Sequence, residues 1–427
     1  MKTLKNIGKI ALLSLALCGG TTSCNYLDVV PPEQASLPDA TKDPESTLGF
    51  LFSCYGGIRN PFDYQTVEAG ADEYVLPPLW NTGSQKITWD LNLPTNIADG
   101  WSWGSNYRFI GQCLLFLQQL PHARGVTDEQ KRAWAAEANF LLAYYHMVTL
   151  VAYGPCPITD TYIDQATPES EYNGRMHFDY VKDWICQKFD EVCEDGQLPA
   201  TRTGDEWGRA TSVMAKALKA RLLVYAASPL FNGSFPYKDW ENTNFETPGY
   251  GKELISLKYD RKKWEVAKAA CQEAITAAEA AGHKLFSLED AQSLYQQAGL
   301  PLPFVPFKSA EGGTADKDKE FMERVQLMRY VVTTRYKEGN RETIWGLANQ
   351  GTMIIGSLPH RVIKNNQGTW KAGYSGVSPT LNTVEHFYTE NGVPIEKDKQ
   401  FYPQSEWYQS AGVTDRSDII KLNTRRE

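Results

Sequence analysis

Apolar side chains recur every three or four residues along residues 208–233, which is the spacing of one face of an α-helix. Bulky side chains form one stripe of this predicted helix: Met214, Leu218, Leu222 and Tyr225. Mostly small side chains form a second stripe beside it: Val213, Ala217, Ala220, Val224 and Ala227. Small side chains let a neighbouring helix approach closely. The pattern therefore predicts a helix covered on two sides, as in the middle of a stacked all-helical body.

The local sequence also predicts the ends of this helix. Thr211 or Ser212 can cap its start, because a hydroxyl accepts a hydrogen bond from a backbone N–H of the first turn. Ser228 precedes Pro229, and the residue before a proline disfavours the helical region. An Asn-Gly pair at residues 232–233 then favours a turn.

The same spacing predicts further helices on both sides. Their expected ranges are Pro44–Arg59, Trp101–Pro121, Thr127–Tyr153, His177–Glu194 and Asp260–Ala281. Thr127 and Gln130 form a capping box at the start of one of them, and Gly154-Pro155 ends it. Short to moderate links favour paired, stacked hairpins that are similar to an irregular tetratricopeptide array, although no clean repeat of about 34 residues is present.

Two other regions have a different pattern. Residues 60–100 are rich in Pro, Gly and Asn, which predicts a long ordered loop region with short strands at most and no helix. Gly, Pro, Asn and Thr also become frequent beyond Gly282. There we expect short helices at Phe321–Thr334 and Pro379–Glu390, a strand at Glu342–Gly346, and a loop-rich subdomain wrapped on the helical body.

The first residues have the features of an export signal. Lys2, Lys5 and Lys9 precede an apolar run at Ile10–Leu17, which is much shorter than the roughly 20 residues that span a bilayer. Small residues then lead to Cys24, which predicts a bacterial lipoprotein with an acylated Cys24. Plain secretion is the alternative, and Cys18 is a competing cysteine that follows a large leucine.

Composition excludes several classes of function. The net charge is −8, and it becomes −11 without the three leader lysines, which argues against nucleic acid as a partner. The sequence has no basic patch for an anionic membrane surface. Six of the eight cysteines follow Cys24, without a CxxC pair or a Cys/His spacing that binds metal. We expect no metal and no cofactor, and leave open a disulfide between distant cysteines.

Several segments together carry a family resemblance, in this order along the chain: Cys24–Pro31 (CNYLDVVP), Tyr55–Asn60 (YGGIRN), Ala71-Asp72-Glu73, Glu137–Tyr145 (EANFLLAYY), Tyr153-Gly154-Pro155, Ala227–Gly233 (ASPLFNG), and Pro379-Thr380 through Phe387 to Asn391-Gly392. With these segments the chain resembles the SusD/RagB family, the outer-membrane nutrient-binding lipoproteins of Bacteroidetes.

The resemblance implies a mostly α fold, in which tetratricopeptide-like stacked helical hairpins carry a loop-rich second subdomain. It implies a lipid-anchored protein at the cell surface that binds a glycan, or sometimes a peptide, without catalysis. Such proteins deliver the ligand to a SusC-like TonB-dependent transporter. Relatives usually continue beyond a run similar to Asn423–Glu427, so the second subdomain is expected to be incomplete.

We therefore divide the chain into residues 1–23 (lipoprotein signal peptide), 24–43 (extended tether), 44–282 (helical scaffold with the inserted loop region 60–100) and 283–427 (loop-rich SusD-like subdomain).

The strongest candidate for ligand contact is the segment that holds Trp101, Trp103 and Asn106. Indoles stack on the apolar C–H faces of sugar rings, and an amide both donates to and accepts from hydroxyls. Starch-binding relatives place aromatic residues in this part of the chain. The alternative is that one or both tryptophans pack the start of the helix. Weaker candidates lie in the two loop regions: Trp80, Trp89, Trp370 and Tyr374.

No catalytic motif is present. Asp72 and Glu73 are adjacent carboxylates, but neighbours on a loop seldom converge on one glycosidic bond, so a capping or structural role is favoured. The histidines are scattered, and neither a phosphate-binding loop nor a nucleophile elbow is found. The alternatives to glycan binding are a secreted glycoside hydrolase and a helical module that binds only protein.

Overall fold

The computed structural model describes residues 37–58, 71–76, 83–93, 95–96, 103–164, 166–297 and short stretches between 324 and 399. The predicted signal peptide, Cys24 and most of the predicted tether lie outside the described residues, as do residues 401–427.

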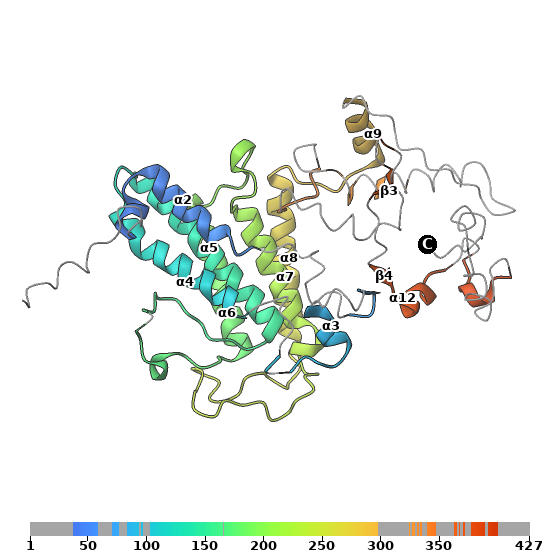
Figure 1. Ribbon diagram of the computed structural model, residues 1–427, viewed down its shortest axis with the longest axis horizontal. Coiled ribbons are helices and arrows are strands. Elements are labelled where there is room, and N and C mark those ends of the chain that lie inside the picture. The colour runs from blue at the N-terminus through green and yellow to red at the C-terminus, as the bar shows by residue number, and fades with distance from the viewer. Residues whose placement is uncertain are drawn as a thin grey trace, which may run out of the picture.

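Antiparallel helices packed side by side form the main body (Figure 1). They are α2 (Pro44–Tyr55), α4 (Trp103–Gln119), α5 (Asp128–Tyr153), α6 (Phe178–Glu191), α7 (Ser212–Ala227) and α8 (Arg261–Ala280). From α4 onward each of them packs on the next, and α2 packs on both α4 and α5. The fold is thus mostly α and consists of stacked helical hairpins, as the sequence predicts.

Helix α7 lies between α6 and α8, so the prediction of a helix covered on two sides is confirmed. Thr211 caps it, because the Thr211 hydroxyl accepts a hydrogen bond from the Met214 N–H at 3.2 Å. The small-residue stripe is wrong at one position: the Val224 side chain is 40% exposed. Val224 lies on a part of the helix that neither neighbour covers, which the spacing of apolar residues alone cannot indicate.

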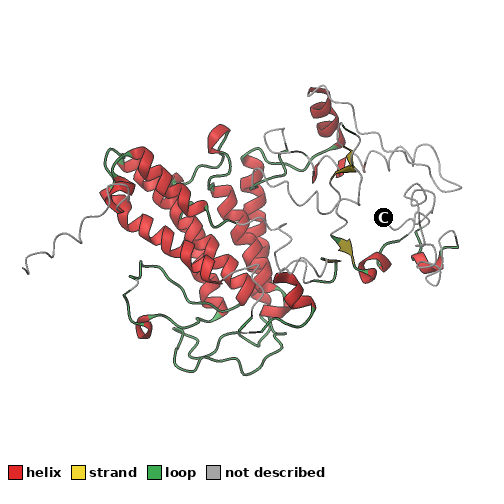
Figure 2. Cartoon of the chain, in the orientation of Figure 1, coloured by secondary structure: helices red, strands yellow, loops and turns green. Residues whose placement is uncertain are grey.

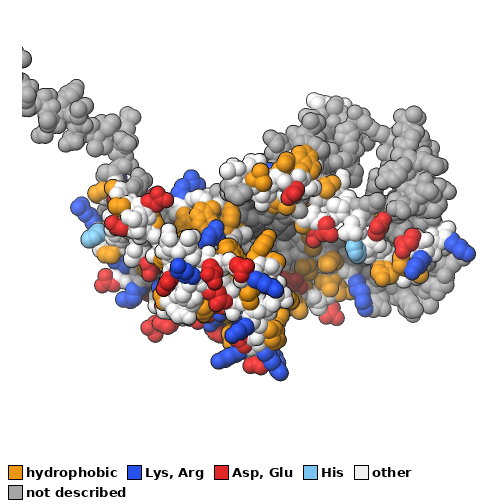
Figure 3. Space-filling model, turned by 90° about the horizontal axis from the view of Figure 1, so that it is seen from below, with side chains coloured by type: hydrophobic (Ala, Val, Ile, Leu, Met, Phe, Trp, Pro, Cys, Tyr) orange, Lys and Arg blue, Asp and Glu red, His pale blue; other side chains and the backbone are white. Residues whose placement is uncertain are grey.

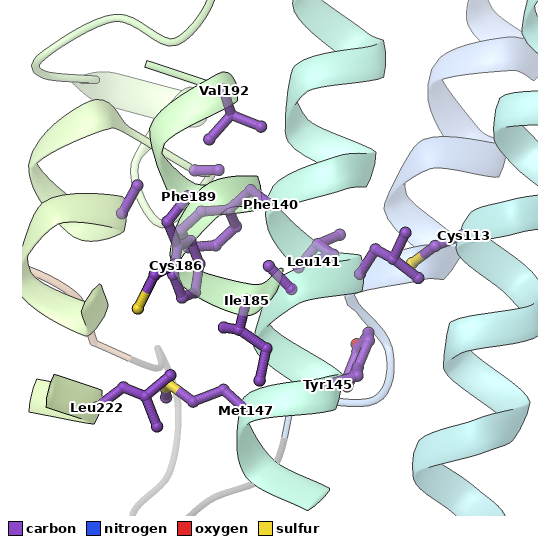
Figure 4. Close-up of a cluster of buried hydrophobic side chains, with 14 of the residues drawn as sticks. Cys113, Phe140, Leu141, Tyr145, Met147, Ile185, Cys186, Phe189, Val192 and Leu222 are labelled. Carbon is purple, nitrogen blue, oxygen red and sulfur yellow. The ribbon is translucent and has the colours of Figure 1, made fainter. Parts of the chain in front are cut away.

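Helix α5 is the centre of the hydrophobic core. Figure 4 shows Phe140 and Tyr145 of this helix between Ile185 and Phe189 on one side and Cys113 on the other. The Phe140 and Phe189 rings lie 5.7 Å apart. The capping box at Thr127 is present, and Gly154 ends the helix with φ of +68°, a conformation that favours glycine.

The described residues also include short 3₁₀ turns and, beyond α8, further α-helices. The turns are η1 (Leu37–Thr41), η5 (Leu120–His122), η6 (Glu169–Glu171), η7 (Glu194–Gly196), η8 (Gly204–Glu206), η9 (Pro229–Phe231) and η11 (Ile395–Lys397). The helices are α9 (Leu288–Gln297) and α12 (Leu381–Glu385). In the predicted helix at Phe321–Thr334, the described positions 324, 327–328 and 331–332 are helical.

The strands described are short and antiparallel (Figure 2). Strand β1 (Tyr74–Val75) pairs with β4 (Ser378–Pro379), and β2 (Ile363–Lys364) pairs with β3 (Trp370–Lys371). The pairing of β1 with β4 joins two segments that are some 300 residues apart in sequence.

Two predictions for the loop regions are wrong. Residues 60–100 contain a helix, α3 (Gly83–Thr88). Residues Glu342–Gly346 do not form a strand. Trp345 instead attaches this segment to the helical body: its indole N–H donates to the Gly208 carbonyl at 2.9 Å, and its ring lies 5.5 Å from the Phe140 ring. The contacts of Trp345 with a distant part of the chain thus determine the conformation of residues 342–346.

The six cysteines after Cys24 are free thiols in this structure. Among the described residues, no helix is both long enough and apolar enough to cross a membrane.

Candidate functional site

Trp103 is the first residue of α4, and its half-buried ring lies within a group of aromatic and cationic side chains. The Tyr107 ring lies 5.1 Å from it, and the Tyr153 ring meets it edge-on at 5.4 Å. The Arg175 guanidinium lies over the indole, 4.8 Å from the ring centroid, which is a cation–π geometry. The Trp103 cluster, as we call these four residues, joins α4, the end of α5 and the loop before α6.

Hydrogen bonds hold the Trp103 cluster in place. The backbone N–H of Trp103 donates to the Tyr153 hydroxyl at 3.1 Å. Arg175 donates to the carbonyl oxygens of Tyr153 at 3.2 Å and Pro155 at 2.6 Å, so its guanidinium is fixed where α5 ends. A ring and a cation that are already fixed lose little conformational freedom when a ligand binds.

Tyr107 of the cluster and the buried groups around it are neutral. The Tyr107 hydroxyl donates to the Pro157 carbonyl at 2.7 Å, and burial raises the pKa of Tyr107 well above its usual value. Burial also raises the pKa of the Cys156 thiol to about 12 and lowers the pKa of His146 to about 4. His146 hydrogen-bonds to the Leu142 carbonyl and the Thr159 N–H. These groups support the cluster and do not exchange protons near neutral pH.

Of the predicted site residues Trp101, Trp103 and Asn106, the structure describes the last two and gives them different surroundings. Asn106 is buried, with 4% of its surface exposed, so its amide faces the protein. Trp103 packs the start of α4, which is the alternative that the sequence left open, although part of its surface remains exposed. Trp101 lies outside the described residues.

Of the other predicted aromatic side chains, the structure describes only that of Trp89. Trp89 follows α3, is 49% exposed, and takes no part in the aromatic pairs around Trp103. Trp80 and Tyr374 lie outside the described residues. Trp370 lies in β3, but its side chain is not described.

The fold of this chain is similar to the folds of solved proteins. A SusD-like protein (BF3747) from Bacteroides fragilis has the same fold, with a TM-score of 0.55 and 17% identity over 86% of this chain and 58% of that one. The protein BT4246 is 53% identical, with a TM-score of 0.75, over 90% of this chain. The chain is SusD-like. The SusD/RagB family predicted from its motifs is confirmed.

The SusD-like chain spans less than two thirds of the length of these structures, since it covers 64% of BT4246. The selenomethionine form of BT4246 matches similarly, at 52% identity and a TM-score of 0.72, over 89% of this chain and 62% of that one. No family model matches the chain, and no curated protein matches it.

The segment Ala71-Asp72-Glu73 is hydrogen-bonded to residues 380–383. A carboxylate oxygen of Asp72 accepts from the Asn382 amide at 3.0 Å, and its backbone carbonyl accepts from the Thr383 hydroxyl at 2.9 Å. The Glu73 carbonyl accepts from the Thr380 N–H at 3.1 Å. Within the described part of the chain, no group of three or more His, Cys, Asp or Glu side chains is arranged to hold a metal ion.

The sequence did not indicate Tyr153 and Arg175 as site residues. The sequence predicted Tyr153 only as the end of a helix, although an aromatic residue that precedes Gly-Pro at a helix end can be recognised in the sequence as a candidate site residue. Arg175 lies in a polar loop with no motif around it. Only the fold shows that it lies over Trp103.

Proposed function

We propose that this SusD-like chain is a cell-surface lipoprotein that binds a nutrient glycan without covalent chemistry and delivers it to a SusC-like TonB-dependent transporter. The observation that carries the proposal is the 53% identity to BT4246 within a SusD-like fold, together with the fixed Trp103 cluster at the segment where the family resemblance expects ligand.

The chemistry of the Trp103 cluster suits a sugar. The exposed part of the indole offers an apolar surface for C–H groups, and the guanidinium of Arg175 offers N–H donors for hydroxyl oxygens. Trp101, two residues earlier, would supply a second ring. Asn106 would act beneath the site as support, because its side chain is buried.

Attachment to the outer membrane would depend on the lipid at Cys24. Acidic and basic side chains are interspersed with apolar ones on the face of the described body in Figure 3, without a basic patch that would hold an anionic bilayer. We therefore propose that the lipid anchor and the transporter partner hold the chain at the outer-membrane surface.

The test is a glycan array that includes plant, fungal, bacterial and animal glycans together with peptides, probed with the chain from residue 25 onward. The best glycan is then titrated by calorimetry. We expect saturable binding that Trp103→Ala weakens about tenfold or more, with weaker loss in Trp103→Phe, which keeps a ring in the packing. Trp264→Ala is the matched control, because Trp264 is an exposed tryptophan on α8, away from the cluster.

The other outcomes would indicate a different ligand or a different function. A folded protein that binds no glycan overturns the proposal, and binding of peptides alone changes the ligand class. Turnover of the bound glycan by pure protein would indicate a hydrolase. For delivery, we expect the lipidated chain to co-purify with a TonB-dependent barrel from the native membrane, and a Cys24→Ala chain to be released from that membrane.

A further inference from the structure

The loop between α7 and α8, residues 232–260, begins and ends at the same place in the fold, and the structure describes all of its residues. Its two ends are tied together by one side chain: Asn232 donates to the Asp260 carbonyl at 3.0 Å and accepts from the Asp260 N–H at 2.7 Å. Further along, the Asn242 amide donates to the Arg175 carbonyl at 2.6 Å. This last bond ties the loop to the backbone of the residue that lies over Trp103.

Aromatic rings extend from the core to the surface along the first part of this loop. Phe231 is buried and stacks on Phe178 at 4.1 Å. Phe235 lies 6.2 Å from Phe231 and stacks on Trp240 at 5.5 Å with an interplanar angle of 10°. Rings that are fixed by packing in this way present a rigid surface.

Tyr237 is the outermost ring of the series. It is 69% exposed and meets the Phe235 ring edge-on at 5.8 Å, so most of its surface is open to solvent. The neighbouring Lys238 and Asp239 are exposed, and within the described chain neither forms an ion pair. A cationic donor and an anionic acceptor thus lie next to an open ring, and both can form hydrogen bonds with the hydroxyls of a sugar that stacks on the ring.

The loop rings are continuous with the Trp103 cluster. A β-carbon placed on Gly154 would lie 3.4 Å from the Trp240 ring, so Trp240 lies directly against Gly154. Gly154 follows Tyr153, whose ring contacts Trp103. The two aromatic surfaces therefore meet at the end of α5.

The size of the surface favours a glycan over a protein partner. A stable protein interface buries about 800 Å² on each partner, whereas a whole aromatic side chain offers only about 150–250 Å². One open tyrosine beside two half-buried rings is too small for a protein interface of that size but matches a few sugar rings.

We infer a second carbohydrate-binding surface, centred on Tyr237 with Phe235 and Trp240 behind it and Lys238 and Asp239 beside it. The inference rests on the proposed function, because this surface would extend the binding of one glycan chain beyond the Trp103 cluster. A long chain that reaches both surfaces gains affinity by avidity, whereas a short oligosaccharide does not.

The experiment compares Tyr237→Ala with the unchanged chain on short and long members of malto-, cello-, laminari-, manno- and galacto-oligosaccharide series, by calorimetry. For the series that binds, we expect Tyr237→Ala to weaken the long oligosaccharide roughly 3- to 10-fold and to leave the short one unchanged. Tyr237→Phe keeps the ring and should bind as the unchanged chain does. Tyr388→Ala is the control, because Tyr388 is also 69% exposed but follows α12.

The outcomes separate the two proposals. If the unchanged chain binds and Tyr237→Ala binds the long oligosaccharide equally well, the second surface is wrong while the proposed function stands. If the unchanged chain binds none of these series and no glycan on the array, both are overturned. Because Tyr237 is mostly exposed, the variant should unfold at the same temperature as the unchanged chain, and a lowered Tm together with lost binding of short oligosaccharides would count against the inference.

Discussion

The hydroxyl of Tyr55 donates a hydrogen bond of 2.7 Å to the carboxylate of Glu137, which is wholly buried in α5. The same hydroxyl accepts from the Ala210 N–H at 2.9 Å, just before α7. Arg202 and Arg209 complete the network with contacts of 3.0 and 2.5 Å to the carboxylate. Burial and the neighbouring Glu137 charge raise the pKa of Tyr55 well above its usual value. This buried network joins α2, α5 and the segment that leads into α7.

Removing Glu137 should therefore destabilise the fold strongly. Glu137→Ala removes the buried carboxylate from two largely buried guanidinium groups, which keep only the exposed Glu206 as an anionic partner. We expect the free energy of unfolding to fall by about 3–5 kcal/mol. Urea unfolding measures this change. The control is Glu273→Ala, which breaks the exposed pair with Lys216 between α7 and α8 and should cost less than about 1 kcal/mol. Equal effects of the two substitutions would contradict the network's importance.

Removing only the hydroxyl of Tyr55 tests the centre of this network. Tyr55→Phe leaves the Ala210 N–H and one carboxylate oxygen of Glu137 each without this partner, so we expect a loss of about 1–3 kcal/mol. Tyr225→Phe is the matched control, because the Tyr225 hydroxyl donates to the Val151 carbonyl at a more exposed position. Thermal unfolding of both variants gives the comparison, and an unchanged Tm for Tyr55→Phe would show that water replaces the hydroxyl.

Gly57 should not tolerate a larger side chain. A β-carbon at this position would overlap the Phe109 ring and lie 2.8 Å from the Tyr145 hydroxyl. We expect Gly57→Ala to cost about 1–3 kcal/mol in unfolding experiments, because the well-packed rings must move. Gly49→Ala provides the opposite result: nothing lies within 4 Å of that position inside α2, so alanine should stabilise the helix by about 0.5–1 kcal/mol. Destabilisation by both would point to a different packing of α2.

Acid should destabilise the fold through two buried histidines. Burial lowers the pKa of His146 and of His177 to about 4, against an ordinary value of 6.5, despite the opposing charges of Asp160 and Asp179 respectively. The unfolded chain then binds more protons between these values, so stability is lost as the pH falls from about 6.5 to about 4. Each histidine contributes up to about 3 kcal/mol to this loss.

Nuclear magnetic resonance can separate the two histidines, because their neutral tautomers are expected to differ. The Nδ1 of His146 faces the Leu142 carbonyl and must carry the proton, whereas the Nδ1 of His177 accepts from the Asp179 N–H, which leaves its proton on Nε2. Ring nitrogen shifts at pH 7 identify the tautomers. Titration of either ring near pH 6.5 in the folded protein would contradict this prediction.

Thr380 should attach α12 to the β1 segment. Its hydroxyl caps α12 by accepting from the Thr383 N–H at 3.2 Å, and it also donates to the Asp72 carbonyl. Thr380→Val removes both bonds, which should cost about 1 kcal/mol locally and speed hydrogen exchange at the α12 amides. Thr276→Val on α8 removes a hydroxyl that bonds only within its own helix and should leave α12 unchanged.

Much of the helical body could be predicted from the sequence because its causes are local. The expected Thr211–Ser228 helix and the observed Ser212–Ala227 helix agree because the cap and the proline act within a few residues. The same holds for α5, where the capping box and Gly154 determine the two ends.

The candidate site was only partly predictable, because its geometry depends on contacts between distant residues. The sequence suggested Trp103 and Asn106 as a pair, but α4 turns the Asn106 amide into the protein. Arg175 reaches Trp103 across more than seventy residues of chain, and Trp240 reaches Gly154 from the loop before α8.

Where most helices of the body begin and end, and which faces they bury, could be predicted without the structure, because hydrophobic spacing and capping are properties of neighbouring residues. Which polar and aromatic side chains meet is known from the folded chain alone. The pairing of β1 with β4, the buried Glu137 network and the Trp103 cluster each join segments that no local pattern connects. Their partners are determined by how the helices pack, and packing depends on the shape of the whole chain.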